Sequence, residues 1–379
     1  MKIIYISNSI IPSRFANSIH VMKMCQAFAD NGHDVTLLAP DCKHRYETGV
    51  DDVFEYYGVR KNFIIKKLPS PNIRGNSWVY TFFIWLFLLK NRDTGLVYGR
   101  FLNGCFVASK MNIPVVFESH VPDFGKKGLV GKLFSSLVSS KQLKFVTVIS
   151  NALKNMYLRE NILPDGRVVV AHDGADAVQC FSNKARLKGS KDALKVGYVG
   201  HLYKGKGVEV IEGLVPYLDK NIELHVIGGM RSDIEKWQRK ISSEQVFFYG
   251  FVKQEKVSSY INALDVCLLP NQRMVLPHGS LNDKDNISDF TSPIKMFDYM
   301  AHGKAIIASN LPVLKEVLTE QNAIFCEPDD YIGWVTAINY FNDKARREQK
   351  GQKALDDFQQ YTWYRRADML LTMLKAQGL

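Results

Sequence analysis

The feature that most constrains the fold of this chain is a strand–loop–helix–strand pattern that occurs twice. An apolar segment at residues 2–7 is followed by helical spacing of apolar residues at 19–31 and by Gly32, a residue type that commonly ends helices. The pattern starts again with an apolar strand at 195–199, after the polar and charged segment 182–194. Short apolar strands separated by helices predict parallel sheets that are buried on both faces. We therefore predict an α/β fold with two Rossmann-like domains.

The predicted domains are residues 1–184 and 185–360. The length of 379 residues supports two domains, because single hydrophobic cores rarely grow beyond about 250–300 residues. In open parallel sheets, ligands bind beyond the carboxyl ends of the strands. Two such domains facing each other would therefore form a ligand-binding cleft.

The cysteines and the most apolar segment exclude several classes of protein. The six cysteines are scattered without a C-x-x-C pair, so we expect reduced cysteines in the cytosol and no zinc ribbon or redox dithiol. The run from Trp78 to Leu89 has 12 residues, fewer than the ~20 that span a bilayer, and predicts a buried or membrane-surface helix. The apolar run at residues 3–6 ends without a cleavage site, so no signal peptide is expected.

The net charge is unevenly distributed along the chain. The whole excess of +11 lies in residues 1–189, which hold 25 Lys and Arg against 14 Asp and Glu, whereas residues 190–379 hold 24 of each. A basic half suits an anionic membrane surface, with a solvated basic face as the alternative. A nucleic-acid partner is not expected, because no helix-turn-helix, zinc-finger or RRM motif accompanies the charge.

The first candidate site is the loop at residues 8–20, which leads into a helix. It lacks the G-x-G-x-x-G pattern, which argues against a standard dinucleotide site. Asn17 or Ser18 can cap the helix, and backbone N–H groups there could hold an anion or a sugar hydroxyl. Simple capping is the alternative.

The second candidate site is a glycine-rich loop that contains Gly200, Lys204 and Lys206 and lies between a strand and a helix. Glycines allow the backbone to approach a ligand, lysines supply positive charge, and a helix N-terminus adds to it. This combination is typical of a diphosphate-binding loop. The alternative is a solvated turn with two exposed lysines.

The third candidate site is the start of a helix predicted at 293–302. Ser292 is predicted as its N-cap and Pro293 as a first-turn residue. Lys295 and Asp298 are three residues apart and share a helix face. The Asp298 carboxylate could bind two ribose hydroxyls, and a surface Lys–Asp pair is the alternative.

Together these segments resemble glycosyltransferase family 4, a family of retaining enzymes with the GT-B fold. The resemblance covers nearly the whole chain, and the motifs occur in the family's order. The matching segments are SNSIIPSRFANSIHVMKMCQAFADNGHDVTLL near the N-terminus, VVFESH at 115–120, VIS at 148–150, VVVAHDGAD at 168–176, VGYVGHLYKGKG at 196–207, HVIGG at 225–229, VFFYGFV at 246–252, INALDVCLLPN at 261–271, SPIKMFDYMAHGKAIIAS at 292–309 and LPVLKEV at 311–317.

The resemblance implies a domain arrangement. The first domain would bind the acceptor and the second the nucleotide sugar, with the two parallel sheets facing across a cleft. The C-terminal helix, at about 361–379, would cross back to the first domain, with Trp363 as a packing residue.

The resemblance also implies how the donor is bound. Lys206 would contact the diphosphate, and His201 stands where the family often has arginine. The motif S-P-x-K-x-x-[ED]-Y-M is similar to that of a subgroup, and Asp298 takes the position of the second of two usual glutamates, while Phe290 stands at the first. Lys295 belongs to this motif and is expected at the donor site.

Backbone groups complete the implied donor site. Because the first acidic residue is absent, Ser292, Pro293 and Ile294 are expected to hold the phosphates or the sugar. Gly250 and Phe251 stand where the family's backbone contacts the nucleotide base.

Two residues of the first domain are implied near the reacting groups. His120 stands at the family's histidine near the donor sugar and, with Lys206, would be catalytic; a core histidine is the alternative. Arg100 follows a strand and would serve an anionic acceptor or pair with Glu118.

The implied reaction uses no metal or other cofactor. The leaving diphosphate would act as the base during attack on the same face of the sugar, and cations would stabilise its growing charge. Asp283 and Asp285 have D-x-D spacing, but they lie in a polar loop and are expected to be solvated.

We thus expect a hexosyltransferase in the cytoplasm, peripheral on the inner face of the cell membrane. Its donor would be a UDP-sugar, with a GDP-sugar second, and its acceptor a glycan or lipid-linked molecule in cell-surface polysaccharide or glycolipid synthesis. The alternative is an epimerase of a UDP-sugar or a non-catalytic protein of the same fold.

Overall fold

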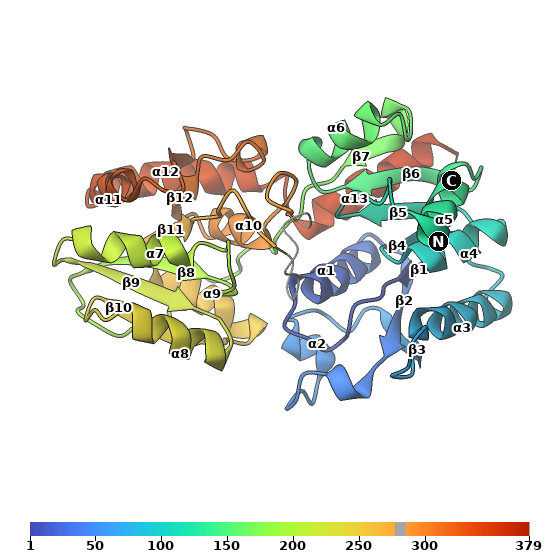
Figure 1. Cartoon of the computed structure of the whole chain (residues 1–379), viewed down its shortest axis with the longest axis horizontal. Coiled ribbons are helices and arrows are strands. Elements are labelled where there is room, and N and C mark those ends of the chain that lie inside the picture. Colours follow the sequence, from blue (N-terminus) through green and yellow to red (C-terminus); the bar gives the residue numbers. More distant parts are fainter. Residues whose placement is uncertain (277–285, 379) are drawn as a thin grey trace. The chain divides into compact units, whose positions relative to one another are not determined.

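The computed structural model describes residues 1–276 and 286–378 and divides the chain into two compact units (Figure 1). Unit 1 contains Met1–Asp173 together with Trp363–Leu379, and unit 2 contains Gly174–Thr362. The polar segment 182–194 therefore lies within unit 2. Asp283 and Asp285, the D-x-D pair, lie outside the described residues.

Unit 1 is built on a seven-stranded sheet within the described residues, in the order β3-β2-β1-β4-β5-β6-β7. Every strand pair in it is parallel. The first strand lies in the interior of the sheet, and its residues after Lys2 are buried. The strands are β1 (Lys2–Ile6), β2 (Asp34–Asp41), β3 (Ile64–Pro69), β4 (Leu96–Gly99), β5 (Val115–Ser119), β6 (Leu143–Val148) and β7 (Val168–Val170).

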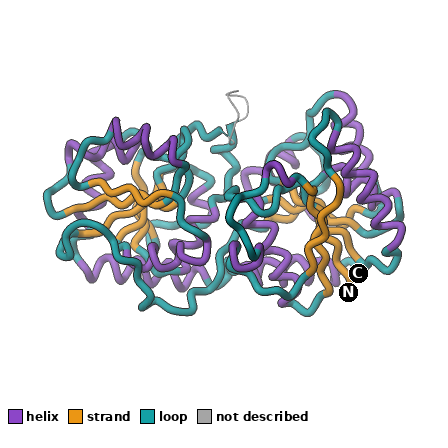
Figure 2. Tube along the Cα trace, turned by 90° about the horizontal axis from the view of Figure 1, so that it is seen from below, coloured by secondary structure: helices purple, strands orange, loops and turns teal. Residues whose placement is uncertain are grey.

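Helices cover the faces of this sheet, as the alternation of helix and strand requires (Figure 2). The helices of unit 1 are α1 (Ala16–Asp30), α2 (Val53–Tyr56), α3 (Asn76–Lys90), α4 (Leu102–Lys110), α5 (Gly128–Val138), α6 (Asn151–Arg159) and α13 (Trp363–Ala376), with short 3-10 turns at Lys43–Arg45 and Asp165–Arg167.

The last helix, α13, belongs to unit 1 although the whole of unit 2 precedes it in the sequence. It packs against α1. Trp363, Arg366, Leu370 and Leu374 are buried and recur at helical spacing, so one face of α13 forms part of the core of unit 1.

Unit 2 has a six-stranded parallel sheet in its described part, in the order β10-β9-β8-β11-β12-β13. Its strands are β8 (Leu194–Val199), β9 (Ile222–Ile227), β10 (Val246–Gly250), β11 (Val266–Leu269), β12 (Ala305–Ser309) and β13 (Ala323–Cys326). Its helices are α7 (Val208–Leu214), α8 (Arg231–Lys240), α9 (Gln254–Ala263), α10 (Ile294–Ala301), α11 (Tyr331–Tyr340) and α12 (Lys344–Phe358), with 3-10 turns at Val215–Tyr217 and Leu314–Glu316.

The predicted α/β fold with two parallel-sheet, Rossmann-like domains is confirmed. The helical pattern at 331–360 is in fact two helices, because the Asp343 side chain accepts hydrogen bonds from Ala345 and Arg346 and starts a new one. The sequence pattern missed β3, in which two lysines interrupt the apolar run, and β13, which has only four residues.

Candidate active site

Each sheet has one point at which the strand order reverses. The loops that follow the two strands on either side of this point run in opposite directions. In unit 1 this switch point lies between β1 and β4, and in unit 2 it lies between β8 and β11. Ligands of open parallel sheets bind at the carboxyl ends of the strands around such a point. Arg100 directly follows β4, and the loop from Gly200 to Gly207 directly follows β8. Two predicted site segments therefore lie at switch points.

In unit 1 a buried network of charged side chains lies beside the switch point. His20, on α1, is 1% exposed and sits between two carboxylates. Its Nε2 is 2.8 Å from Glu118 Oε1, and its Nδ1 is 2.8 Å from Asp173 Oδ1. Asp173 is the last residue of unit 1 before the chain enters unit 2. It thus helps to hold the His20 side chain in the core.

Arg366, from α13, balances the negative charge of Glu118 in this network. Its Nη2 donates to Glu118 Oε1 over 2.8 Å and to the Ala171 carbonyl over 3.0 Å, and its Nε donates to the His172 carbonyl over 2.8 Å. Burial alone would raise the pKa of Glu118, but the charges of His20 and Arg366 hold it well below its ordinary value. Glu118 therefore remains an anion inside the protein.

His120 lies at the edge of the same network. Its Nε2 is 2.9 Å from Glu118 Oε1. Burial, together with the positive charge of Arg100, lowers the pKa of His120 to about 4. A neutral imidazole beside a carboxylate must carry its proton on the nitrogen that faces the carboxylate, so Nε2 donates and Nδ1 is left as an acceptor. The prediction that His120 contacts the donor sugar stays a prediction.

Arg100 does not take the role of ion-pair partner to Glu118 that the sequence left open. No hydrogen bond or ion pair joins the two side chains in the described part of the chain, and Arg366 occupies that position. The Nη1 of Arg100 is buried without a hydrogen-bond partner among the described residues. A guanidinium with a buried, unpaired N–H group beside a switch point is suited to bind an anionic group.

Asn17 and Ser18 lie in the first turn of α1 and do not cap it, which corrects the prediction. The helix starts at Ala16, and Phe15 is its N-cap residue without a side-chain hydrogen bond. The buried Ser18 hydroxyl lies 2.8 Å from the Phe15 carbonyl oxygen and 3.0 Å from that of Ser13. Ser18 therefore fixes the path of the loop before the helix.

Three residues of the unit 1 network have the composition of a metal site. One ligand atom from each of His20, His120 and Asp173 lies within 4.8 Å of the others. Both nitrogens of His20, however, face carboxylates at 2.8 Å, and the cation that balances Glu118 is Arg366. The arrangement is that of an ion-pair network that is balanced by its own side chains.

In unit 2 the glycine-rich loop requires glycine at specific positions. Gly205 and Gly207 have φ values of 86° and 101°, in the region that other residues rarely adopt. A Cβ atom on Gly207 would overlap the Pro270 carbonyl, and one on Gly205 would overlap the Met274 carbonyl. The loop after β8 therefore packs its backbone closely against the chain that follows β11.

Two lysines extend into this part of unit 2. The Lys295 Nζ is buried without a hydrogen-bond partner among the described residues and lies 3.8 Å from the centroid of the Tyr198 ring. Burial lowers the pKa of Lys206 to about 8. Burial, followed by the charge of Lys206, lowers the pKa of Lys295 well below its ordinary value. The surface Lys–Asp pair that was the alternative for Lys295 and Asp298 is not formed, because the Lys295 ammonium is buried.

Other unpaired polar atoms surround the same loop. Glu209 Oε2 and both side-chain polar atoms of Asn271 are buried without hydrogen-bond partners in the described part of the chain. Glu209 lies at the start of α7, and Asn271 follows β11. Buried polar groups are normally paired, so a cluster of unpaired ones indicates a place where a ligand supplies the partners.

The remaining predicted donor residues are less enclosed. Lys204 and Phe251 are exposed, and Gly250 ends β10 with a φ of 76°. His201 is half-buried, and its carbonyl accepts a hydrogen bond of 2.6 Å from the Tyr198 hydroxyl.

The start of α10 differs from the prediction. The helix begins at Ile294, and Pro293, not Ser292, is its N-cap residue. The buried Ser292 and the half-buried Asp298 are both part of unit 2, as are all the predicted donor residues.

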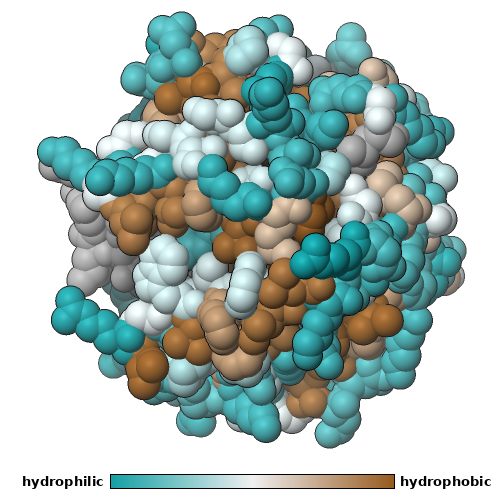
Figure 3. Space-filling view, turned by 90° about the vertical axis from the view of Figure 1, so that its right-hand side faces the viewer, coloured by the Kyte–Doolittle hydropathy of each residue, from teal (hydrophilic) through white to brown (hydrophobic). Residues whose placement is uncertain are grey.

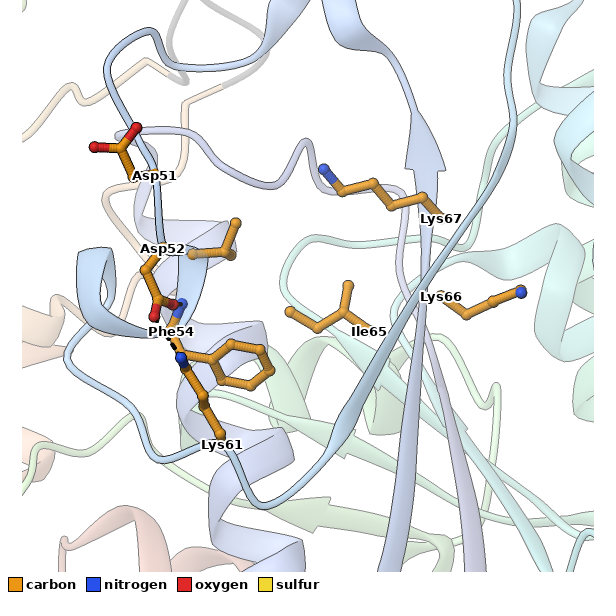
Figure 4. Close-up of a pocket in the computed structure, with 8 residues that line it drawn as sticks. Asp51, Asp52, Phe54, Lys61, Ile65, Lys66 and Lys67 are labelled. Atoms are coloured by element: carbon orange, nitrogen blue, oxygen red, sulfur yellow. Dashed lines mark hydrogen bonds and ion pairs between the residues drawn. The ribbon is translucent and has the colours of Figure 1, made fainter.

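Unit 1 also contains an open groove of about 630 Å³ between α2 and β3 (Figure 4). Lys61 pairs with Asp52 at 2.6 Å, and Lys67 extends into the opening, with its Nζ 3.8 Å from the centroid of the Tyr46 ring. The groove is lined by Asp51, Asp52, Val53, Phe54, Lys61, Ile65, Lys66 and Lys67.

Sequence reasoning missed His20, Asp173 and Arg366 as members of the unit 1 network. One signal was available, because Glu118 and His120 are two residues apart at the end of a strand whose first three residues are apolar. No local pattern marks Arg366, which lies 248 residues from its partner Glu118.

Two family models match most of the chain. The model described as Glycosyltransferase Family 4 matches residues 18–179, and the model described as Glycosyl transferases group 1 matches residues 193–342. A curated relative, an uncharacterized glycosyltransferase of Methanocaldococcus jannaschii (MJ1069), is 23% identical over 345 residues, which cover 84% of this chain and 83% of that protein.

Several solved structures share the fold over the whole length. Sucrose-phosphate synthase from Thermosynechococcus elongatus has a TM-score of 0.72 at 16% identity, with 100% of this chain and 99% of that chain covered. Alr3699/HepE of Anabaena, in complex with UDP, has a TM-score of 0.71 at 12% identity, with 99% and 100% covered. The lipopolysaccharide outer core galactosyltransferase WaaB has a TM-score of 0.67 at 13% identity, with 100% of both chains covered.

Proposed function

This chain is a glycosyltransferase with the GT-B fold, related to family 4, and on that basis we propose that it transfers a hexose from a nucleoside-diphosphate sugar to a glycan or lipid-linked acceptor. UDP is the proposed nucleotide, and GDP is the second choice. The observation that carries the proposal is the glycine-rich loop after β8, with the buried ammonium of Lys295 and the enclosed one of Lys206 beside it. The presence of UDP in the Anabaena neighbour supports the choice of nucleotide.

The proposed reaction retains the configuration of the sugar. The bond between C1 and the diphosphate oxygen breaks, the acceptor oxygen bonds to the same face of C1, and the acceptor proton passes to the leaving phosphate. Negative charge grows on the diphosphate as the bond breaks, so cations held at that position stabilise the transition state more than the ground state. We assign this role to Lys206, and we propose that no metal cofactor is needed because lysines supply the charge.

Unit 1 is proposed to bind the acceptor. Arg100 supplies an unpaired, buried N–H group, and Nδ1 of His120 supplies a hydrogen-bond acceptor for a sugar hydroxyl. The hydrogen bond to Glu118 holds the His120 side chain without a ligand. An acceptor with a phosphate or carboxylate group fits the charge of Arg100.

The donor is tested by thermal shift with UDP, GDP and a panel of their sugars. A ligand that binds the folded protein raises its free energy of unfolding by mass action, by about 2.7 kcal/mol at one hundred times its Kd, and so raises the thermal midpoint. The true donor is expected to raise the midpoint more than the free nucleotide. If no member of the panel raises it, the proposed donor site is wrong.

The transfer itself is tested by nucleotide release. Release that requires the added acceptor supports glycosyl transfer, whereas conversion of the donor sugar without an acceptor would indicate an epimerase. Product anomers analysed by NMR test retention of configuration. Addition of EDTA is expected to leave the rate unchanged.

We further propose that unit 1 binds the surface of an anionic membrane. Among the described residues, no helix combines the length and hydropathy needed to cross a bilayer. Helix α3, however, has two apolar faces: Tyr80, Ile84 and Leu88 are buried, whereas Trp78, Phe82 and Trp85 are 47%, 52% and 39% exposed. An exposed row of large aromatic side chains on one helix face suits the membrane interface.

Exposed basic residues occur in the same part of unit 1 as this aromatic face. Apolar and hydrophilic side chains alternate over this side of unit 1 (Figure 3). Helices α3, α4 and α5 pack in that order, and α5 begins with the exposed Leu129 and Val130. The exposed basic residues in and beside these helices are Arg74, Lys90, Arg92, Lys110, Lys126, Lys127 and Lys132. Each basic residue near an anionic leaflet contributes about 1 kcal/mol to binding.

Sedimentation with vesicles tests the membrane proposal. More of the protein is expected to sediment with vesicles that contain about 30% phosphatidylserine than with vesicles of pure phosphatidylcholine. The reason is that the anionic phosphatidylserine attracts the basic residues. The double variant Phe82→Ser and Trp85→Ser is expected to reduce this binding. Tyr217→Ser, which changes an exposed aromatic residue of unit 2, is the control. Equal sedimentation with both vesicle types would contradict the membrane proposal and would favour the alternative, a solvated basic face.

A further inference from the structure

The amino group of Lys295 is buried without a partner among the described residues, which is unusual for a lysine. Its Nζ is inaccessible to solvent and has no hydrogen-bond partner in the described part of the chain. A buried ammonium without a partner is costly, because burial removes its hydration and nothing replaces it. The Tyr198 ring, at 3.8 Å from the Nζ, provides one cation–π contact.

The position of this ammonium relates it to the glycine-rich loop. A Cβ atom placed on Gly200 would lie 2.8 Å from the Lys295 Nζ, so the lysine reaches the first residue after β8. Lys206 lies in the same loop and is close enough for its charge to act on Lys295. Two lysine amino groups from different elements, the loop after β8 and the first turn of α10, thus share one site.

We propose that Lys295 is a second diphosphate ligand beside Lys206, and that the two lysines together take up a proton from solvent when a nucleoside diphosphate binds. The proposal rests on the donor proposed above, a nucleoside-diphosphate sugar. A diphosphate carries two or more negative charges and several acceptor oxygens, which would satisfy both ammonium groups at once.

The other groups around the two lysines do not replace this ligand. Tyr198 and Tyr203 are neutral phenols whose pKa values are raised by burial. The Glu209 carboxylate is in contact with the loop, and its Oε1 accepts a hydrogen bond of 3.4 Å from the Gly205 N–H. No ion pair joins Glu209 to either lysine in the described residues.

The proton balance follows from the free state. In the free protein the pKa of Lys206 is about 8, and that of Lys295 is well below its ordinary value. A bound diphosphate favours the charged forms and raises both values. Binding therefore takes up a proton wherever the pH lies between the free and the bound values. Affinity is expected to fall by up to about tenfold per pH unit above pH 8 for each proton taken up.

Calorimetric titration with UDP, and with GDP in parallel, tests the inference on the full chain. At pH 8, binding heats measured in buffers of different ionisation enthalpy are expected to show net proton uptake by the wild-type protein. The Lys295→Met variant is expected to bind at least tenfold more weakly and to take up fewer protons. The control is Lys256→Met, which removes an exposed lysine of α9 in the same unit and is expected to match the wild type.

The outcomes separate this inference from the proposed function. Wild-type protein that binds neither UDP nor GDP would overturn the donor site and the inference with it. Wild-type protein that binds UDP, while Lys295→Met binds equally tightly or wild-type binding takes up no proton at pH 8, would overturn the inference alone. Lys295→Gln gives a second neutral variant with a polar end, and the thermal midpoint of each variant shows that it is folded.

Discussion

Replacing Lys206 with methionine is expected to make the ligand-free protein more stable while it abolishes donor binding. Methionine keeps most of the length and apolar contacts of the lysine side chain but removes the charge. In the folded protein the pKa of Lys206 is about 8, against an ordinary value of 10.5, because the ammonium is enclosed. This difference corresponds to about 3 kcal/mol of unfavourable charging in the folded state.

The pH range of this effect follows from the direction of the shift. The folded state favours the neutral lysine, so between about pH 8 and 10.5 the unfolded chain binds more protons and stability rises with pH. Below about pH 8 the folded protein carries the full cost of the buried charge. The gain from Lys206→Met is therefore expected to be about 3 kcal/mol at pH 7 and to vanish towards pH 10.5.

Thermal unfolding of the ligand-free protein from pH 6 to 10 measures this gain. For a unit of this size, 1 kcal/mol moves the midpoint by about 2–4 °C, so the expected increase for unit 2 at pH 7 is about 6–12 °C. Lys256→Met, an exposed substitution, is the control and is expected to leave the midpoint within about 2 °C. A midpoint of Lys206→Met that equals or falls below that of the wild type at pH 7 would refute the reasoning.

Three further predictions concern other parts of the two units. Arg366→Met leaves the buried Glu118 without its guanidinium partner and is expected to destabilise unit 1 by about 3–5 kcal/mol, measured by denaturant unfolding. Gly207→Ala is expected to weaken UDP binding and to lower the midpoint, because its Cβ would overlap a backbone carbonyl; Gly32→Ala, with φ of 82° but open space around its Cβ, is expected to cost only about 1 kcal/mol. The pH profile of kcat/KM is expected to show no acid limb near pH 6.5 from His120, since burial lowers its pKa to about 4; a limb near 6.5 that disappears in His120→Gln would contradict this.

The order of strands and helices could be predicted from the sequence because it depends on local apolar patterns. Segments such as β1 and β11, which are mostly apolar and buried, stand out in any window of the chain. The edge strand β3 did not, because Ile64, Lys66 and Pro69 along it are exposed and, among the described strands, it pairs with β2 alone. Edge strands commonly carry lysine, which weakens the apolar signal.

The candidate site could be predicted only where one short segment carries it. The loop from Gly200 to Gly207 was recognisable because glycine, lysine and a helix start follow each other in the sequence. The network around Glu118 was not, because its members come from α1, from two strand ends and from the last helix. Lys295 illustrates the same limit, since its spacing from Asp298 left a surface pair open as an alternative, and only the tertiary structure shows that its amino group is buried.

The origin of α13 has a consequence for the synthesis of the chain. Glu118 becomes a buried anion of unit 1, but its partner Arg366 is made 248 residues later. At ribosomal rates of about 5–20 residues per second, Arg366 is synthesised roughly 10–50 s after Glu118. Unit 2, which is continuous in sequence, can complete its own sheet during that interval. We therefore expect the nascent chain to acquire its native structure in the reverse of the usual order, with the second unit complete while the first still lacks its closing helix.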